Sequence, residues 1–124
     1  MKRGHIMKRM VMSVIFLSLI LLPMFSAATD VGGLINTDTT WNLAGSPYIV
    51  IGNTLVASGA RLTIEPGVQV RFNGGEGYWL RIEGNIQAKG SFNNEILFTS
   101  NSLSPKRGNW QGIFMIRNTG SELS

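Results

Sequence analysis

The chain of 124 residues contains no cysteine and a single histidine, His5, close to its start. Without cysteine, neither disulfide bonds nor thiol catalysis is possible. Without a later histidine, histidine triads and histidine metal sites are excluded beyond the first few residues. No Asn-x-Ser/Thr triplet occurs, so the sequence offers no acceptor for N-glycosylation. Whatever holds this chain together and gives it a function must depend on other groups.

An excess of charge is also missing once the first segment is set aside. Four of the eleven Lys and Arg residues lie at 2–9, which leaves seven basic residues against seven Asp and Glu. A nucleic-acid interface needs positive charge in excess, because binding is driven by the release of counterions from phosphates. We therefore expect no nucleic-acid partner.

The only long apolar run lies in residues 1–28. Basic residues at 2–9 precede "MVMSVIFLSLILLPMF", and Ser26-Ala27-Ala28 follows it. A basic start, a short apolar run and a small-x-small site are typical of a signal peptide. Pro23 interrupts the run, which falls short of the roughly 20 apolar residues that span a bilayer. We predict cleavage after Ala28, a secreted or cell-surface protein, and membrane contact only during export; an uncleaved anchor is the alternative.

Helical periodicity is absent from Thr29 onward, and a period of two takes its place. Short segments such as "VQVRF", "LRI" and "ILFTS" alternate along the chain and are separated by Gly, Pro, Asn or Ser. Proline and glycine at the separators favour sharp corners. The pattern predicts an all-β domain of short strands.

One segment of the sequence is nearly repeated. Residues 62–70 read "LTIEPGVQV" and residues 80–88 read "LRIEGNIQA", at an offset of 18. Such a repeat favours a coil of stacked parallel strands in which like residues form ladders. An antiparallel sandwich is the alternative, because short strands with turn signals also suit that class. In the coil we expect the following side chains to face inward: Leu62, Ile64, Val68, Val70, Phe72, Leu80, Ile82, Ile86 and Ala88.

The 18-residue offset also predicts specific neighbours on the outside of the coil. It places Glu65 on Glu83 and Gln69 on Gln87. By the same offset, Arg71 lies over Lys89, and Trp79 lies above Arg61.

We expect three parts: the signal peptide 1–28, an edge-covering segment 29–47, and about three β-helix turns over 48–124 that continue beyond the last residue. In the first turn we expect Ile49, Ile51, Leu55 and Ala57 to face inward. The segment "NWQGIFMI" should return to lie over Leu80–Ile82. An open last turn must be covered by more chain, another molecule or a second copy.

The ordered series "GARLTIEPGVQVRFNG", "LRIEGNIQAKG", "ILFTS" and "NWQGIFM" resembles the opening turns of secreted right-handed parallel β-helix repeat proteins of the pectate-lyase-like superfold. The resemblance covers about residues 41–124. It implies an exported protein with a structural, adhesive or carbohydrate-binding role, as the N-terminal portion of a larger surface protein.

The candidate binding residues are aromatic or basic. Tyr78, Trp79 and Trp110 lie beside turns, where exposed rings can stack on sugar faces; packing roles are the alternative. Arg71 with Lys89 is a candidate contact for an anionic sugar. The proposed partner is therefore a polysaccharide or another cell-surface component.

Catalysis has little support in these residues. The one candidate acid pair is Glu65 with Glu83, and two solvated corner residues are the alternative. We expect no catalytic residue, no metal and no cofactor in this stretch. A polysaccharide lyase or glycoside hydrolase whose catalytic residues lie outside it is the alternative function.

Overall fold

The computed structural model describes residues 27–116 and 120–124, and the expected signal peptide at 1–28 lies almost wholly outside them. Within the described ranges no helix is long and apolar enough to cross a membrane. Those ranges hold the following elements: β1 (Thr29–Ile35), β2 (Thr39–Trp41), the 3-10 helix η1 (Leu43–Gly45), β3 (Tyr48–Val56), β4 (Arg61–Ile64), β5 (Gln69–Phe72), β6 (Tyr78–Ile82), β7 (Asn85–Ala88), β8 (Leu97–Ser100), β9 (Trp110–Met115) and β10 (Glu122–Leu123).

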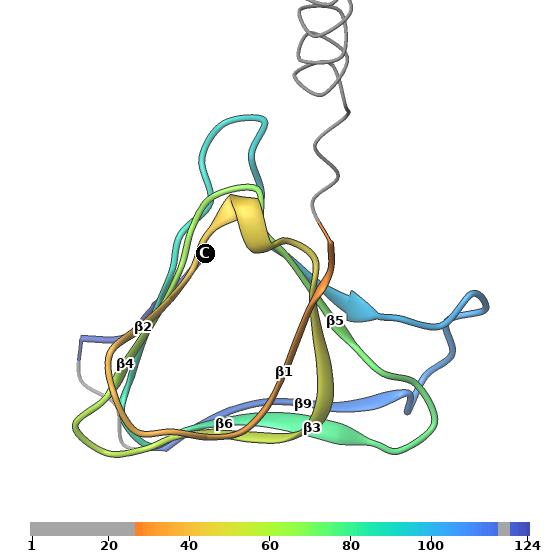
Figure 1. The fold of residues 1–124 in the computed structure, drawn as a ribbon, viewed down its shortest axis with the longest axis horizontal. Helices are drawn as coiled ribbons and strands as arrows, with labels where there is room; N and C mark the ends of the chain where they lie inside the picture. Colours follow the sequence, from red (N-terminus) through yellow and green to blue (C-terminus); the bar gives the residue numbers. More distant parts are fainter. Residues whose placement is uncertain (1–26, 117–119) are drawn as a thin grey trace, which may run out of the picture.

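The strands wind into a coil with a triangular cross-section (Figure 1). All pairings between these named strands are parallel. The first face holds the N-terminal halves of β1 and β3 with β5 and β8, and the second face holds their C-terminal halves with β6 and β9. The third face holds β2, β4, β7 and β10.

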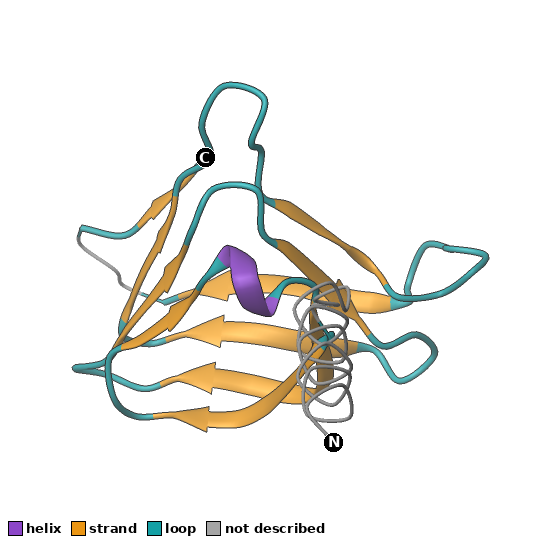
Figure 2. Cartoon of the chain, turned by 45° about the horizontal axis from the view of Figure 1, so that its top comes forward, coloured by secondary structure: helices purple, strands orange, loops and turns teal. Residues whose placement is uncertain are grey.

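The chain visits the three faces in turn and then starts again one strand spacing farther along the axis. Over residues 27–116 and 120–124 it builds four such rungs, whose strands lie side by side in Figure 2. Loops leave the coil at its corners, and the longest of them are residues 89–96 and 101–109. The fold is a parallel β-helix, so the expected fold class is confirmed and the antiparallel alternative is wrong.

The expected 18-residue register is wrong. Leu62 lies beside Ile86, 24 positions later, and Val70 lies beside Phe98, 28 positions later. On the second face Thr54 lies beside Leu80, 26 positions later. The stacks expected at an offset of 18, namely Glu65 on Glu83, Gln69 on Gln87, Arg71 on Lys89 and Trp79 on Arg61, therefore do not form.

The near-repeat has a different physical origin. Each copy is a strand, a tight corner and a second strand: the first copy turns from β4 on the third face to β5 on the first, and the second turns from β6 on the second face to β7 on the third. At one corner Gly67 has a φ of 82°, which favours glycine. At the other corner a Cβ on Gly84 would lie 2.2 Å from the carbonyl oxygens of Ala57 and Ala60. The two similar sequence segments therefore form similar turns at two different corners of the triangle.

The inward-facing set predicted between 62 and 88 is confirmed. All nine side chains are at most 2% exposed and belong to one core cluster. Alternation is a property of each strand alone, because successive side chains of a strand point to opposite sides. The inward set is therefore correct even though the register was not.

The inward set predicted for the preceding turn is out of phase by one residue. Tyr48, Val50, Thr54 and Val56 face the core, whereas Ile51 is 48% exposed. Both alternations of "YIVIGNTLV" are apolar, so period two alone does not choose between them. Pairing with the next rung selects the inward alternation, because Tyr48 and Val50 lie beside the buried Val70 and Phe72.

Both ends of the described chain add strands to the coil. Segment 29–47, expected to cover the edge, forms β1 and β2, which pair with β3 and β4 and so make a rung of their own. Trp41 stacks on Tyr48 with ring centroids 5.1 Å apart, and the Tyr48 hydroxyl donates to the Asn42 carbonyl at 3.0 Å. At the other end β9 lies beside β6 with Leu80 next to Ile113, as expected.

Introduced cysteines report the register directly, because the natural chain has none. A Thr63→Cys, Gln87→Cys variant should form a disulfide on mild oxidation, since these two positions are cross-strand neighbours and such neighbours lie about 4.8 Å apart, a separation that disulfides span. A Gln69→Cys, Gln87→Cys variant should stay reduced, because its positions lie on different faces. Intact mass before and after alkylation measures both, and the opposite pattern would restore the 18-residue register.

Candidate functional site

A groove of about 520 Å³ lies along β6 and β9 on the second face, lined by outward side chains of β6 and by side chains from both sides of β9. Its walls combine one indole, one guanidinium, one amide and several apolar side chains. We call it the Trp79 groove and define it by its lining residues: Trp79, Arg81, Gln111, Ile113, Phe114, Met115 and Ile116.

Trp79 reaches this groove because of its place in β6 and because of its neighbour in β9. Leu80 and Ile82 are fully buried, so alternation turns Trp79 and Arg81 outward. The register between β6 and β9 shifts between Tyr78 and Trp79, which brings Gly112 beside Trp79. Gly112 has a φ of 136°, and a Cβ built on it would meet nothing within 4 Å. The space beside the indole is therefore open.

The backbone and the neighbouring charges hold this part of β6 in place. The Trp79 amide donates to the Asn53 side-chain oxygen at 3.2 Å, which ties β6 to the preceding rung. Arg81 Nε lies 3.3 Å from a Glu83 carboxylate oxygen, and both side chains are largely exposed. An exposed pair of this kind contributes little to stability, but it aligns the guanidinium along the strand, where Arg81 is also in register with Phe114.

The other two predicted aromatic residues have packing roles. Trp110 stacks on the buried Phe72, with ring centroids 4.3 Å apart and planes 10° from parallel. Tyr78 is half-buried, packs against the core cluster and lies in register with Trp110. Of the three predicted rings, only Trp79 lines the groove.

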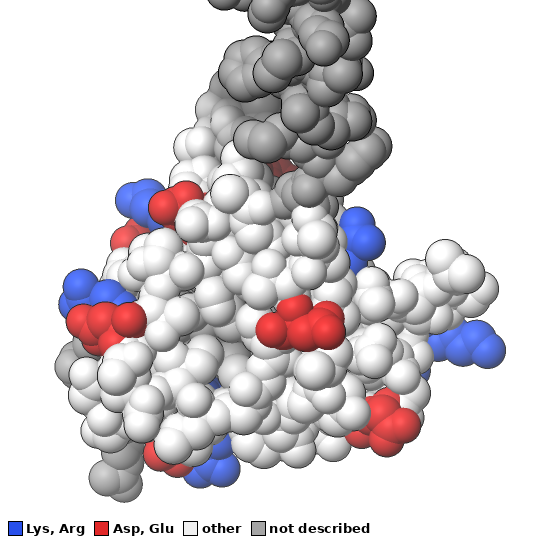
Figure 3. All heavy atoms as spheres, viewed as in Figure 1, with Lys and Arg blue, Asp and Glu red and all other residues white. Residues whose placement is uncertain are grey.

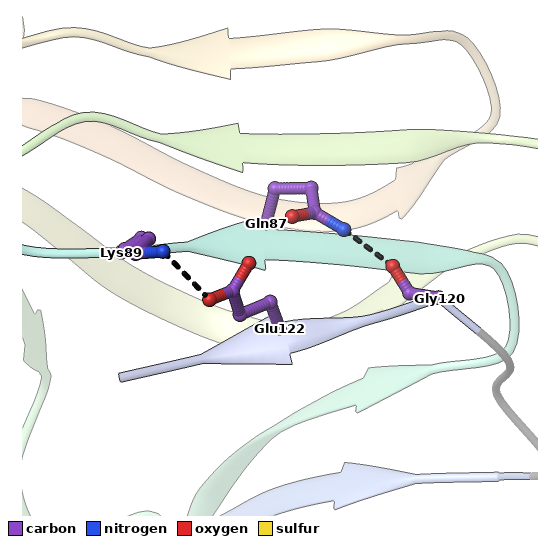
Figure 4. A network of polar contacts seen from close by, with 4 residues as sticks. All are labelled: Gln87, Lys89, Gly120 and Glu122. Carbon is purple, nitrogen blue, oxygen red and sulfur yellow. Dashed lines mark hydrogen bonds and ion pairs between the residues drawn. The ribbon is translucent and has the colours of Figure 1, made fainter.

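The two predicted anion contacts lie on different faces of the coil. Arg71, in β5, donates twice to the Gln69 side-chain oxygen, at 2.6 Å and 3.1 Å. Lys89 follows β7 on the third face and pairs with Glu122 at 3.2 Å (Figure 4). The structure therefore does not bring Arg71 and Lys89 together, and no site is formed by the two jointly.

Acidic residues form no cluster in the described ranges. Glu65 and Glu83 belong to different corners, so the candidate acid pair is separated. Within residues 27–116 and 120–124 no three Asp, Glu, His or Cys side chains lie close enough to hold a metal ion. Basic and acidic side chains are interspersed over the face shown in Figure 3, without a broad patch of one sign.

A second, polar hollow of about 450 Å³ lies at the corner between the first and second faces. Its polar groups largely satisfy one another: Asn109 Oδ1 accepts from the Lys106 amide at 2.7 Å and from the Ser100 hydroxyl at 3.2 Å. Asn101 donates to Asn73 at 3.5 Å. The sequence did not indicate this hollow, because residues 73–75 and 101–109 meet only through the 28-residue register.

Gln111 and Phe114 are groove residues that the sequence also did not indicate. Alternation along "NWQGIFMI" suggests which of them face outward, but their place in the same groove as Trp79 depends on the rung register. The only signal for this groove in the sequence was a Trp-x-Arg segment followed, one rung later, by a strand that carries an aromatic residue.

Comparisons with known proteins agree with this architecture. Residues 33–121 match the family described as pectate-lyase like beta helix domain. A stretch of 71 residues, 57% of the chain, is 41% identical to "Protein bark beetle" of Drosophila melanogaster and covers 2% of that protein. The chain thus spans a very small part of this relative. No solved structure matches the chain.

The two tryptophans on β6 and β9 should differ in their effect on stability. Trp110→Ala removes a ring stacked in the core and should lower the free energy of unfolding by about 2–4 kcal/mol. Trp79→Ala removes a ring from an open groove and should cost about 1 kcal/mol or less. Urea unfolding of both variants measures the difference, and equal losses would assign Trp79 a packing role as well.

Proposed function

Since the chain belongs to the pectate-lyase-like β-helix domain family, we propose that it is an exported β-helix scaffold that binds a polysaccharide through the Trp79 groove. The observation that carries this proposal is the composition of the groove. A half-buried indole, a guanidinium and an amide line one hollow on the second face of the coil. The coil supplies a rigid platform, and the groove supplies the contact.

A sugar ring suits these groups. Its C–H face is apolar and packs on an indole, while its hydroxyls form hydrogen bonds at the rim. In the groove Trp79 and Phe114 offer apolar surface, and Arg81 and Gln111 offer donors. The Arg81–Glu83 pair uses the Nε of a guanidinium that has five N–H donors, so further donors remain for a ligand.

The described residues favour binding over catalysis. Glycoside hydrolysis needs two carboxyl groups facing each other across the scissile bond. No Asp or Glu is among the residues that line the groove, and the nearest acid along the strand, Glu83, is paired with Arg81. We therefore assign the groove a recognition role.

Export is the second half of the proposal. The predicted cleavage point after Ala28 falls immediately before β1, whose first residue is Thr29. Cleavage there would leave every strand of the coil intact. The lack of cysteine also means that the fold does not depend on an oxidising compartment.

Binding of glycans should depend on Trp79. On affinity gels containing cellulose, chitin, xylan or pectin, at least one polymer should retard the wild-type chain. Trp79→Ala should weaken that interaction by roughly tenfold, because about 1.4 kcal/mol of stacking and burial is lost. Phe92→Ala is the matched control, since Phe92 is 90% exposed on the loop after β7 and lies outside the groove. Equal binding by Trp79→Ala and wild type would remove the groove from the proposal.

Processing of the leader should be visible at the N terminus. When the chain is expressed with export, N-terminal sequencing of the product should begin at Thr29. Ala28→Arg should block or shift that cleavage, because the position before the cut must be small. A secreted product that still carries residues 1–28, or a wild-type chain that is never exported, would overturn this half of the proposal.

A further inference from the structure

The polar hollow between the first and second faces lies between two successive rungs of the coil. Its lining comes from the turn after β5 and the loop after β8, which project from the same corner of the triangle (Figure 1). We call it the Lys106 hollow and define it by its lining residues: Asn73, Gly74, Gly75, Asn101, Ser102, Ser104, Lys106 and Asn109. Both segments lie within the continuous range 27–116, and none of these residues lines the Trp79 groove.

The space in the hollow depends on the absence of a side chain at residue 74. A Cβ built on Gly74 would lie 3.4 Å from Ser102 Cβ and 3.8 Å from both Asn109 Nδ2 and Ser100 Oγ. A larger side chain at this position would therefore extend into the space between the two segments. The volume of about 450 Å³ is enough for a small charged group together with part of the molecule that carries it.

Hydrogen bonds within the hollow occupy acceptors and leave donors over. Asn109 Oδ1 accepts from the Lys106 backbone amide and from the Ser100 hydroxyl. Asn73 Oδ1 accepts from the Asn101 side-chain amide. The Nδ2 groups of Asn73 and Asn109 have no acceptor among the residues that the structure describes. The hollow therefore has more free N–H donors than its own acceptors can use.

Two backbone amides and an ammonium group add to this excess of donors. The amides of Gly74 and Gly75 donate to no acceptor in the described part of the chain, and the Lys106 ammonium makes no ion pair there. No Asp or Glu lines the hollow. Its two segments, 73–77 and 101–109, contain two cations, Lys106 and Arg107, against one anion, Glu76. The local charge is therefore positive.

We propose that the Lys106 hollow binds a tetrahedral oxyanion, the sulfate or phosphate group of an ester. The oxygens of an ionised group of this kind only accept hydrogen bonds, whereas the hydroxyls of a neutral sugar both donate and accept. An excess of N–H donors matches the oxyanion. The Lys106 ammonium supplies charge-assisted hydrogen bonds, and successive amides in the glycine turn can line an anion-binding concavity. A hollow without carboxylates does not suit a hard cation.

Dextran sulfate and dextran provide the first test, because the two polymers share a backbone and differ in their sulfate groups. Native gels that contain dextran sulfate should retard the full chain, expressed with export, and gels that contain dextran should not. Lys106→Gln should weaken the interaction roughly tenfold, the effect of losing one charge-assisted hydrogen bond.

Arg107→Gln is the matched control for Lys106→Gln. It removes the same charge from the next residue, which is also exposed but does not line the hollow. Because an exposed charge outside the site contributes little, this variant should bind dextran sulfate within about twofold of wild type. The comparison separates a site from a general attraction between the chain and a polyanion.

Gly74→Leu tests the hollow without a change of charge. The φ of Gly74 lies outside the left-handed region, so leucine can adopt this backbone, and its side chain would occupy the hollow. Binding to dextran sulfate should fall by roughly tenfold or more. Circular dichroism and thermal unfolding check that the variant is folded; if it is not, the Lys106→Gln and Arg107→Gln pair still decides.

Trp79→Ala should bind dextran sulfate as wild type does, since the proposal does not rest on the Trp79 groove. Failure of glycan binding at that groove and failure of oxyanion binding at the Lys106 hollow are therefore measured separately.

Inorganic ions identify the group that is bound. Sodium sulfate should release the chain from dextran sulfate at a lower concentration than sodium chloride of equal ionic strength, because general screening is then the same. Sodium phosphate is compared in the same way. Better competition by sulfate assigns the hollow to sulfate esters, and better competition by phosphate assigns it to phosphate esters.

Four results would overturn the proposal. Equal retardation by dextran and dextran sulfate would mean that sugar hydroxyls are recognised. Equal losses in Lys106→Gln and Arg107→Gln would mean diffuse attraction between charges. Release by sulfate, phosphate and chloride at the same ionic strength would mean screening alone. A wild-type chain has no such site if dextran sulfate does not retard it and phosphate raises its melting temperature no more than that of Lys106→Gln.

Discussion

Stacking of one rung on the next is the interaction on which the rest of this structure depends. The strands are two to nine residues long, too short to be stable alone, and each has a hydrophobic side that only a neighbouring rung can cover. No cysteine is available for a staple, and the described residues hold no metal cluster. The coil is therefore stabilised by parallel strand pairing and by continuous inward ladders of side chains, such as Val50 on Phe72 and Leu62 on Ile86. The Trp79 groove and the corners are both consequences of this constraint.

The sequence predicts which strand residues face inward better than it predicts the register between rungs. Period two identifies the inward side of β4 to β7 because alternation is a local property of a strand. Register is not local: it is set by the lengths of the corners and loops between strands, and these change from rung to rung, so that spacings of 24, 26 and 28 residues coexist. The near-repeat at 18 reports corner chemistry around Gly67 and Gly84. In "YIVIGNTLV", where both alternations are apolar, even the phase required knowledge of the next rung.

The same distinction applies to the site. Trp79 faces outward by alternation, and that could be read from the sequence. Its setting depends on Gly112, Gln111 and Phe114, which belong to the following rung and reach it through a shifted register. Trp110 has the same residue type beside a turn, yet it stacks on Phe72 in the core. Aromatic type and turn proximity therefore do not separate a ring that packs from one that lines a groove.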